Sequence, residues 1–216
     1  MPDVVLSPDA VIGDSTAAWR HGRAPDYSKT RKFWAESTCS FSRTPTTRAP
    51  SVLQKLTRNN LPAKKMSHEA GSLPSLVENL VKNWEIEASF KTSFNDWRTV
   101  DTSSYTFSLN GGPKNDGNHM LTVGTYNALI ASNKYYDPEK SSFDSSHKSF
   151  KRMMPTFAWE VLEVYSGPPT VTFKWRHWGE MKSDYIGYNS YVPEIIRSPP
   201  RLILSFLHMN ANLVEI

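Results

Sequence analysis

Two aromatic and β-branched runs in the second half of the chain constrain the fold most strongly. They span Phe157 to Tyr165 and Thr170 to Trp178, and the residues Ser166-Gly167-Pro168-Pro169 separate them. Such runs are typical of β-strands, and a four-residue connection that contains Gly joins antiparallel neighbours. The sequence therefore predicts a long β-hairpin over residues 157–178.

The segments before the hairpin show the periodicity of helices. Over residues 73–91 an apolar stripe recurs at helical spacing behind a Pro near the first turn. Further helices are predicted around His119 to Ser132 and Ser142 to Met154, and a strand around Tyr105 to Leu109. Helices that precede long antiparallel strands indicate the α+β class, with N-terminal helices packed on a curved antiparallel sheet.

Residues 1–72 differ from the rest of the chain in composition. They are rich in Ser, Thr and Pro and irregular in pattern, apart from two short helices predicted around Tyr27 to Glu36 and around Val52 to Arg58. The second of these lies outside the residues that the structure describes. Between Arg20 and Lys65, eleven Lys or Arg stand against two acidic residues. This basic segment contains no recognisable nucleic-acid module, so we interpret it as a solvated arm. The predicted organisation is an arm over 1–72 and one α+β domain over 73–216.

The composition excludes several kinds of site. The single cysteine, Cys39, excludes internal disulfides and a multi-cysteine zinc site. Residues 1–18 lack a basic start followed by an apolar run, and no segment has the roughly 20 apolar residues that span a bilayer. The six histidines show no metal-ligand spacing. We therefore expect a cytoplasmic protein that uses no metal or cofactor and binds neither membrane nor nucleic acid.

The hairpin contains the predicted catalytic pair. If Tyr165 opposes Thr170, the antiparallel register places Glu160 and His177 as diagonal neighbours on one largely apolar face. A carboxylate beside an imidazole raises its basicity and fixes its tautomer, as a general base requires. The alternative is a structural hydrogen-bonded pair. A register error of one residue would turn Glu163 and Arg176 inward instead.

Five other side chains are candidates for binding an apolar substrate. Leu162, Phe173 and Trp175 share the predicted hairpin face with the catalytic pair. Trp84 lies on the first helix stripe and Tyr126 on the second predicted helix. For these two helical residues, packing in the core is the alternative interpretation.

Several motifs resemble the pathogen-related proteins of plants and fungi. The hairpin sequences from Trp159 to Pro169 and from Phe173 to Gly179 are the most specific of them. The others are Trp19-Arg20-His21-Gly22, Pro25-Asp26-Tyr27, Asn83-Trp84-Glu85, Gly124-Thr125-Tyr126-Asn127-Ala128 and Tyr136-Asp137-Pro138. The resemblance covers roughly residues 18–33 and 73–181, and it fades after about Tyr185.

This resemblance implies a SnoaL-like, or nuclear transport factor 2-like, cone fold with part of the arm ordered against the domain. Proteins of that class include polyketide cyclases, dehydratases, isomerases and pericyclic cyclases, alongside members without known activity. One departure lies at Phe90, where members of the family often have His. That change removes one polar group from the implied pocket.

Together these observations predict a cofactor-independent cyclase or isomerase that acts on an apolar polyketide or terpenoid intermediate. A pericyclase such as a Diels–Alderase, or a dehydratase, fits the same description. The alternative is a non-catalytic stress protein that binds a small molecule. A third interpretation is a scaffold that forms a homodimer through the outer face of the sheet.

Overall fold

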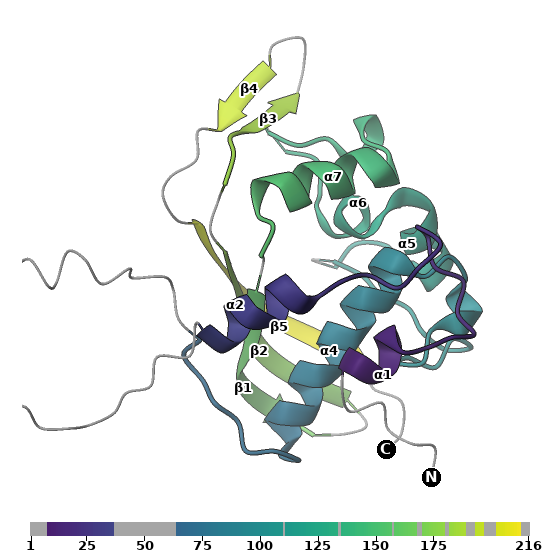
Figure 1. Cartoon of the computed structure of the whole chain (residues 1–216), viewed down its shortest axis with the longest axis vertical. Coiled ribbons are helices and arrows are strands. Elements are labelled where there is room, and N and C mark those ends of the chain that lie inside the picture. Colours follow the sequence, from purple (N-terminus) through teal and green to yellow (C-terminus); the bar gives the residue numbers. More distant parts are fainter. Residues whose placement is uncertain are drawn as a thin grey trace, which may run out of the picture.

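The computed structural model describes residues 8–36, 64–109, 111–133, 135–156, 158–167, 170–179, 182–188, 193–196 and 202–212. Helices come first along the chain and strands follow them (Figure 1). The mixed α+β class predicted from the sequence is confirmed. The helices are α1 (Pro8–Ile12), α2 (Ser28–Glu36), α4 (Leu73–Phe90), η1 (Phe94–Asp96), α5 (Gly117–Val123), α6 (Thr125–Leu129), η2 (Pro138–Lys140) and α7 (Phe143–Met153). The strands are β1 (Ala158–Ser166), β2 (Thr170–Gly179), β3 (Tyr185–Tyr188), β4 (Pro193–Ile196) and β5 (Leu202–Asn212).

The strands form two antiparallel sheets. One sheet has the order β1-β2-β5, and β3 pairs with β4 in the other. The predicted hairpin is confirmed as β1 and β2, whereas Phe157 lies outside the described residues. β5 extends the sheet with a segment of chain beyond the point at which the family resemblance fades. β1 is an edge strand and β2 is the central one.

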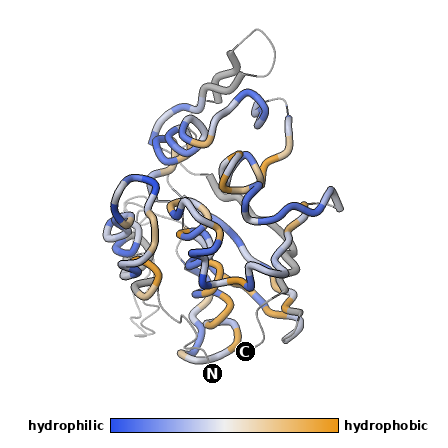
Figure 2. Tube along the Cα trace, turned by 90° about the vertical axis from the view of Figure 1, so that its right-hand side faces the viewer, coloured by the Kyte–Doolittle hydropathy of each residue, from blue (hydrophilic) through white to orange (hydrophobic). Residues whose placement is uncertain are grey.

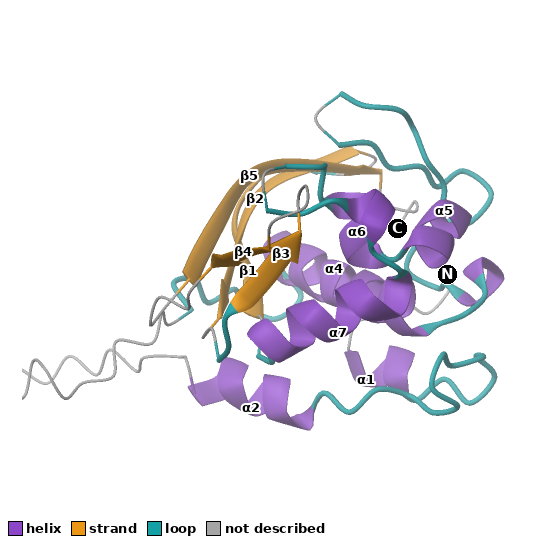
Figure 3. Cartoon of the chain, turned by 90° about the horizontal axis from the view of Figure 1, so that it is seen from above, coloured by secondary structure: helices purple, strands orange, loops and turns teal. Residues whose placement is uncertain are grey.

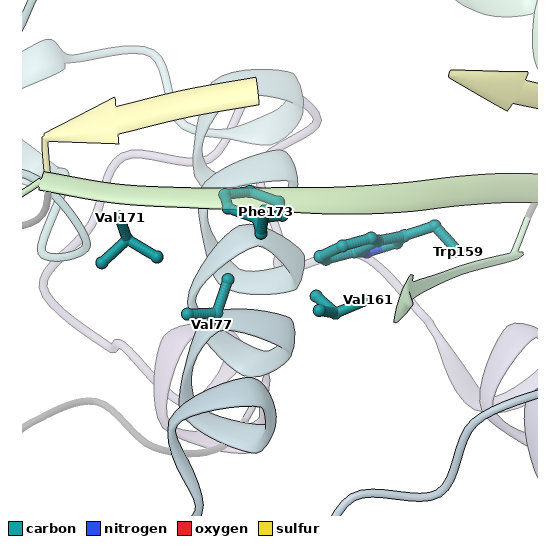
Figure 4. Packing of buried hydrophobic residues seen from close by; sticks show 5 residues of the cluster. All are labelled: Val77, Trp159, Val161, Val171 and Phe173. Carbon is teal, nitrogen blue, oxygen red and sulfur yellow. The ribbon is translucent and has the colours of Figure 1, made fainter. Parts of the chain in front are cut away.

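The long helix α4 and the hairpin bury the largest apolar cluster near the sheet. α4 begins behind Ser72 with a Pro in its first turn, as the sequence predicts, and it ends at Phe90. Val77 of α4 packs against Trp159 and Val161 of β1 and against Val171 and Phe173 of β2 (Figure 4). All five side chains are buried, and each contributes about 1.5–3 kcal/mol by leaving water. The first part of the predicted apolar stripe, with Leu73, Val77 and Val81, therefore packs α4 on the sheet, whereas Trp84 and Ala88 pack in a second cluster.

The elements form layers around α4. Seen from above, β1, β2 and β5 curve along one side of α4, and α1 lies on the other side (Figure 3). α6 and α7 flank α4 and complete the helical part of the domain. Within the described ranges, no helix is long and apolar enough to cross a bilayer.

Two predicted elements differ in the structure. The helix predicted around His119 to Ser132 is divided into α5 and α6 at Gly124, whose φ of 104° interrupts helical geometry. The predicted strand around Tyr105 to Leu109 is wrong. A tight turn after Leu109 returns the chain at once, so that one isolated bridge forms between Phe107 and Asn115.

The N-terminal residues are attached to the end of α4. The backbone N–H of Arg20 donates to the carbonyl of Phe90 at 2.8 Å, and that of Thr92 donates to Ala18 at 3.0 Å. Lys91 Nζ lies 3.0 Å from Asp14 Oδ2, and both side chains are buried. These contacts hold residues 14–20 against the domain. The domain boundary at residue 72 stays a prediction.

Candidate functional site

The pairing of β1 with β2 differs from the predicted register. Glu160 lies opposite Arg176 and not opposite Trp175. Beside the turn the ladder begins with Ser166 opposite Thr172 and not with Tyr165 opposite Thr170, so it starts three positions away from the predicted register. The ladder then steps over Tyr165 and Leu162, which removes two of these positions and leaves Glu160 shifted by one. A bulge inserts one extra residue into a strand and shifts every pair beyond it. The predicted register is therefore wrong.

The carboxylate of Glu160 is fully engaged in structural contacts. Arg176 Nε donates to Glu160 Oε1, and the backbone N–H groups of Lys65 and Met66 donate to Oε2 at 2.8 and 2.9 Å. Glu160 and Arg176 are both buried. They share one face of the sheet, whereas His177 belongs to the other, because neighbouring residues of a strand alternate between faces. The predicted Glu160–His177 pair is wrong, and Glu160 instead holds residues 65–66 against the sheet.

His177 lies in an aromatic environment on the face of the sheet that carries Trp159. Its Nδ1 donates to the carbonyl of Ala158 at 3.2 Å, and its ring meets that of Trp175 edge-on at a centroid distance of 4.7 Å. Burial lowers the pKa of His177 to about 4, and the positive charge of Lys151 acts in the same direction. The expected rise in basicity is therefore wrong, because burial disfavours the protonated imidazole.

The other predicted hairpin residues lie in or next to the core. Phe173 is fully buried in the cluster around Val77, and Trp175 packs at the margin of that cluster. Leu162 occupies the first irregularity of β1 and is half-buried. Their role in substrate binding stays a prediction.

The two predicted helical residues have different surroundings. Trp84 Nε1 donates to the hydroxyl of Tyr105 at 2.9 Å within a second apolar cluster. Tyr126 stacks on Phe150 at a centroid distance of 4.3 Å and meets the ring of His147 edge-on at 5.5 Å. Tyr126, which is one of the seven predicted site residues, is therefore in ring contact with His147. His147 lines the pocket that is described next.

A pocket of about 460 Å³ lies between the N-terminal arm and α7. The arm contributes residues between His21 and Thr30, and α4 contributes Phe90. α7 is predominantly hydrophilic (Figure 2), and it turns one polar face toward the pocket. The pocket residues of that segment are Phe143, Asp144, His147, Lys148, Lys151 and Pro155. The volume lies within the roughly 300–1,000 Å³ of small-molecule sites.

Aromatic rings surround Phe90 in this pocket. The centroid of the Phe90 ring lies 5.3 Å from that of His147, 6.0 Å from that of Tyr27 and 6.4 Å from that of His21. Each pair is tilted or edge-to-face, a favourable arrangement for aromatic rings. Phe90 therefore gives the pocket an apolar wall.

Two polar atoms of the pocket residues are buried without a hydrogen-bond partner among the described residues. They are His147 Nε2 and the hydroxyl oxygen of Tyr27. Tyr27 is only 7% exposed, and its ring packs edge-on against Phe90. Buried polar atoms are nearly always hydrogen-bonded in proteins. Both atoms are shielded from solvent, so each side chain must turn before its polar atom can bond a molecule in the pocket.

The electrostatic surroundings keep both groups neutral at physiological pH. Burial lowers the pKa of His147 to about 4, and the positive charges of Lys151, His21 and Arg20 lower it further. Burial also raises the pKa of Tyr27 well above its ordinary value. A neutral imidazole and a neutral phenol can each donate or accept one hydrogen bond. The pocket can thus bind a carbonyl or hydroxyl group of a ligand through hydrogen bonds between neutral groups.

A carboxylate and an ammonium lie next to this wall. Lys151 Nζ is 3.9 Å from Glu85 Oε1 and 5.7 Å from the centroid of the Tyr27 ring. Burial raises the pKa of Glu85, and Lys151 opposes that rise. Within the part of the chain that the structure describes, no group of three or more His, Cys, Asp or Glu side chains is arranged to hold a metal ion.

Sequence reasoning missed Tyr27, Phe90 and His147 as pocket residues. One signal was present, because Asp144, His147, Lys148 and Lys151 recur at the spacing of one helix face. Pro25-Asp26-Tyr27 also belongs to the motifs that resemble the family. The assignment of residues 1–72 to an arm hid the contribution of Tyr27.

The described fold and pocket define an α+β protein with a cavity of small-molecule size. The chain belongs to the pathogen-related protein family. It is 30% identical over 184 residues to a pathogen-related protein of Hordeum vulgare, and the matched region covers 82% of this chain and 67% of that protein. No family model matches the sequence, and no solved structure matches it.

Proposed function

We propose that the chain binds a small, largely apolar molecule in the pocket between the arm and α7, and that it acts on this molecule as a cofactor-independent isomerase or cyclase. The observation that carries the proposal is the buried imidazole of His147, whose Nε2 has no partner among the described residues and lies beside the aromatic wall at Phe90. A site with one apolar wall and a few convergent polar groups is the usual form of a small-molecule pocket.

The chemistry follows from the two neutral donors. When His147 Nε2 or the Tyr27 hydroxyl donates to a substrate carbonyl, it stabilises the negative charge that develops on oxygen during enolisation or ring closure. A pericyclic closure needs even less, namely a wall that holds the reactive conformer and one donor that polarises the carbonyl. Cyclisation, isomerisation and dehydration of polyketide or terpenoid intermediates all have such a step.

The proposal includes a SnoaL-like cone fold. The feature that supports it is the curved antiparallel sheet that runs along the long helix α4 (Figure 3). The cytoplasmic location and the homodimer stay predictions.

A non-catalytic small-molecule carrier is the second candidate, and one observation favours it. An imidazole with a pKa of about 4 is a weak base, so it is better suited to hydrogen bonding than to abstracting a proton. Such a group positions a ligand even where no bond changes.

Metabolite profiles of a host that carries the neighbouring genes test the proposal. The host receives no copy, the natural chain, His147→Gln or Lys114→Gln, the last of which alters an exposed residue that does not line the pocket. We expect a converted product with the natural chain and the Lys114 variant, and accumulation of its precursor with His147→Gln. Identical profiles with and without the natural chain would count against an enzyme and leave the carrier.

A further inference from the structure

The polar wall of the pocket is unequal in charge. α7 presents Asp144, His147, Lys148 and Lys151 to the cavity on one helix face, and the arm adds Arg23 on the opposite wall. Cationic side chains thus outnumber acidic ones on α7. The apolar wall at Phe90 lies between these two polar surfaces.

The acidic pocket residues already have interactions of their own. Hydrogen bonds from the side chain of Ser28 and from its backbone N–H, the latter at 2.9 Å where α2 begins, lower the pKa of Asp26. Asp144 acts electrostatically on Arg20, whose guanidinium lies 3.6 Å from the centroid of the Phe143 ring. Asp26 thus acts electrostatically on Arg23, and Asp144 acts on Arg20 and His147, whereas no carboxylate of the described residues forms an ion pair with Lys148.

Lys148 has no ion-pair partner among the described residues. Arg23 acts on Asp26 electrostatically, and it too forms no ion pair within 4.0 Å in the described ranges. Lys148 is exposed at the pocket and lies one residue beyond His147 on α7. Its ammonium is available to an anion that enters the pocket.

The charged groups around the imidazole of His147 also give it a positive electrostatic potential. Lys151, His21 and Arg20 each disfavour a positive charge on His147, and Asp144 alone opposes them. A region that repels a proton attracts an anion. Burial has the largest effect on His147 and disfavours ions of either sign, so the attraction of an anion rests on these cations and on Lys148 and Arg23 around the same cavity.

We propose that the ligand of this pocket is a small amphipathic acid. Its apolar rings lie against Phe90, and its acidic group lies toward Lys148 and the unpartnered Nε2 of His147. This inference rests on the proposed function only in requiring that the pocket binds a small molecule, and it holds for an enzyme and for a carrier alike.

Two fluorescent probes that share one ring system test the inference. 8-Anilinonaphthalene-1-sulfonate carries an anionic group, and N-phenyl-1-naphthylamine is the same molecule without it. We expect Lys148→Met and Arg23→Met each to weaken binding of the sulfonate by up to about fivefold, the upper end of the range for an exposed ion pair. Binding of the neutral probe should be unaffected. Raising the salt concentration should weaken binding of the sulfonate probe and leave binding of the neutral probe unchanged.

A matched control and a blocked pocket separate the outcomes. Lys114→Met removes an exposed cation that does not line the pocket and should change neither titration. Phe90→Trp should fill the cavity and weaken binding of both probes. Thr30→Trp, on the opposite wall, replaces it if Phe90→Trp does not fold.

If filling the pocket weakens binding of both probes but the charge variants bind the sulfonate as the natural chain does, the ligand is not an acid. The pocket is then still a binding site for a small molecule. If neither probe binds, or if the filled variants bind both as the natural chain does, the pocket itself is not a binding site. That second result would overturn the proposed function as well.

Discussion

Arg176 lies directly opposite Glu160 across β1 and β2, and its Nε donates a hydrogen bond to Glu160 Oε1 where both side chains are buried. The backbone N–H groups of Lys65 and Met66 complete the shell around the carboxylate. The guanidinium also lies over the ring of Trp178, at 4.7 Å from its centroid. This pair therefore joins the edge strand, the central strand and the segment before α4.

Glu160→Gln should destabilise the fold by about 3–5 kcal/mol, because it removes a buried carboxylate that pairs with a buried guanidinium. Urea unfolding measures the loss. Glu163→Gln changes an exposed carboxylate of the same strand and should cost less than about 0.5 kcal/mol. The double variant Glu160→Met with Arg176→Met should recover much of the stability. A stable Glu160→Gln protein with lost activity would instead support the catalytic role predicted from the sequence.

Acidification should unfold the protein through its two buried histidines. His147 and His177 both have a pKa of about 4 in the folded chain, against an ordinary value of 6.5. Between these values the unfolded chain binds protons that the folded chain does not, so stability rises with pH and falls as pH drops below about 6.5. At pH 5 each histidine should cost about 2 kcal/mol relative to pH 8.

Urea unfolding of single variants at pH 8, 6 and 5 checks this pH dependence. His177→Gln and His147→Gln should each flatten the fall in stability, whatever their effect at pH 8. His119→Gln, at an exposed histidine, should leave it unchanged. Equal slopes in all three variants would show that other groups cause the acid sensitivity.

The periodic parts of the fold could be predicted from the sequence, and the pairing could not. The stripe over residues 73–91 and the runs on either side of Gly167 each determine one element through local spacing, and both are confirmed. The register depends on where the ladder begins beside the turn and on the irregularities at Leu162 and Tyr165, and no local pattern marks either. The ladder begins with Ser166 opposite Thr172, and the shift of one position that remains at Glu160 places it on the opposite face from His177.

The pocket could not be predicted because its walls are distant in sequence. Tyr27, Phe90 and His147 meet only after α7 packs near α4 and the backbone of Arg20 pairs with that of Phe90. Each residue alone resembles an ordinary core or surface residue. The compositional shift at residue 72 pointed to a separate arm, although residues 21–30 form one wall.

Gly124→Ala should destabilise the fold more than an ordinary substitution at a positive φ. The backbone at Gly124 has φ 104°, and a Cβ there would lie 3.0 Å from Phe143 Cα. Strain and crowding together should cost about 2–4 kcal/mol. Gly71→Ala is the control, because Gly71 has φ 80° and open space around its Cα. Thermal unfolding of both variants isolates the crowding, and equal losses would show that Phe143 yields without cost.

Asp14→Ala should weaken ligand binding although Asp14 does not line the pocket. Asp14 forms a buried ion pair with Lys91, and hydrogen bonds from Thr16 and Lys91 hold its pKa at about 2 against the opposing effect of burial. Removing the carboxylate leaves Lys91 with Glu87 as its remaining carboxylate partner among the described residues, at 3.0 Å, and should cost about 3 kcal/mol. The arm that continues from Asp14 into the pocket wall should then detach more often.

Hydrogen exchange at the amide of Arg20 and titration with the naphthalene probes check this coupling together. The Arg20 amide, which donates to Phe90 at 2.8 Å, should lose protection, and both probes should bind more weakly because one wall of the cavity is displaced. Glu69→Ala removes an exposed carboxylate and should alter neither measurement. If stability falls while the Arg20 amide stays protected and the probes bind normally, the ion pair stabilises the helix end alone, and the pocket wall is held by the backbone bonds at Ala18 and Arg20.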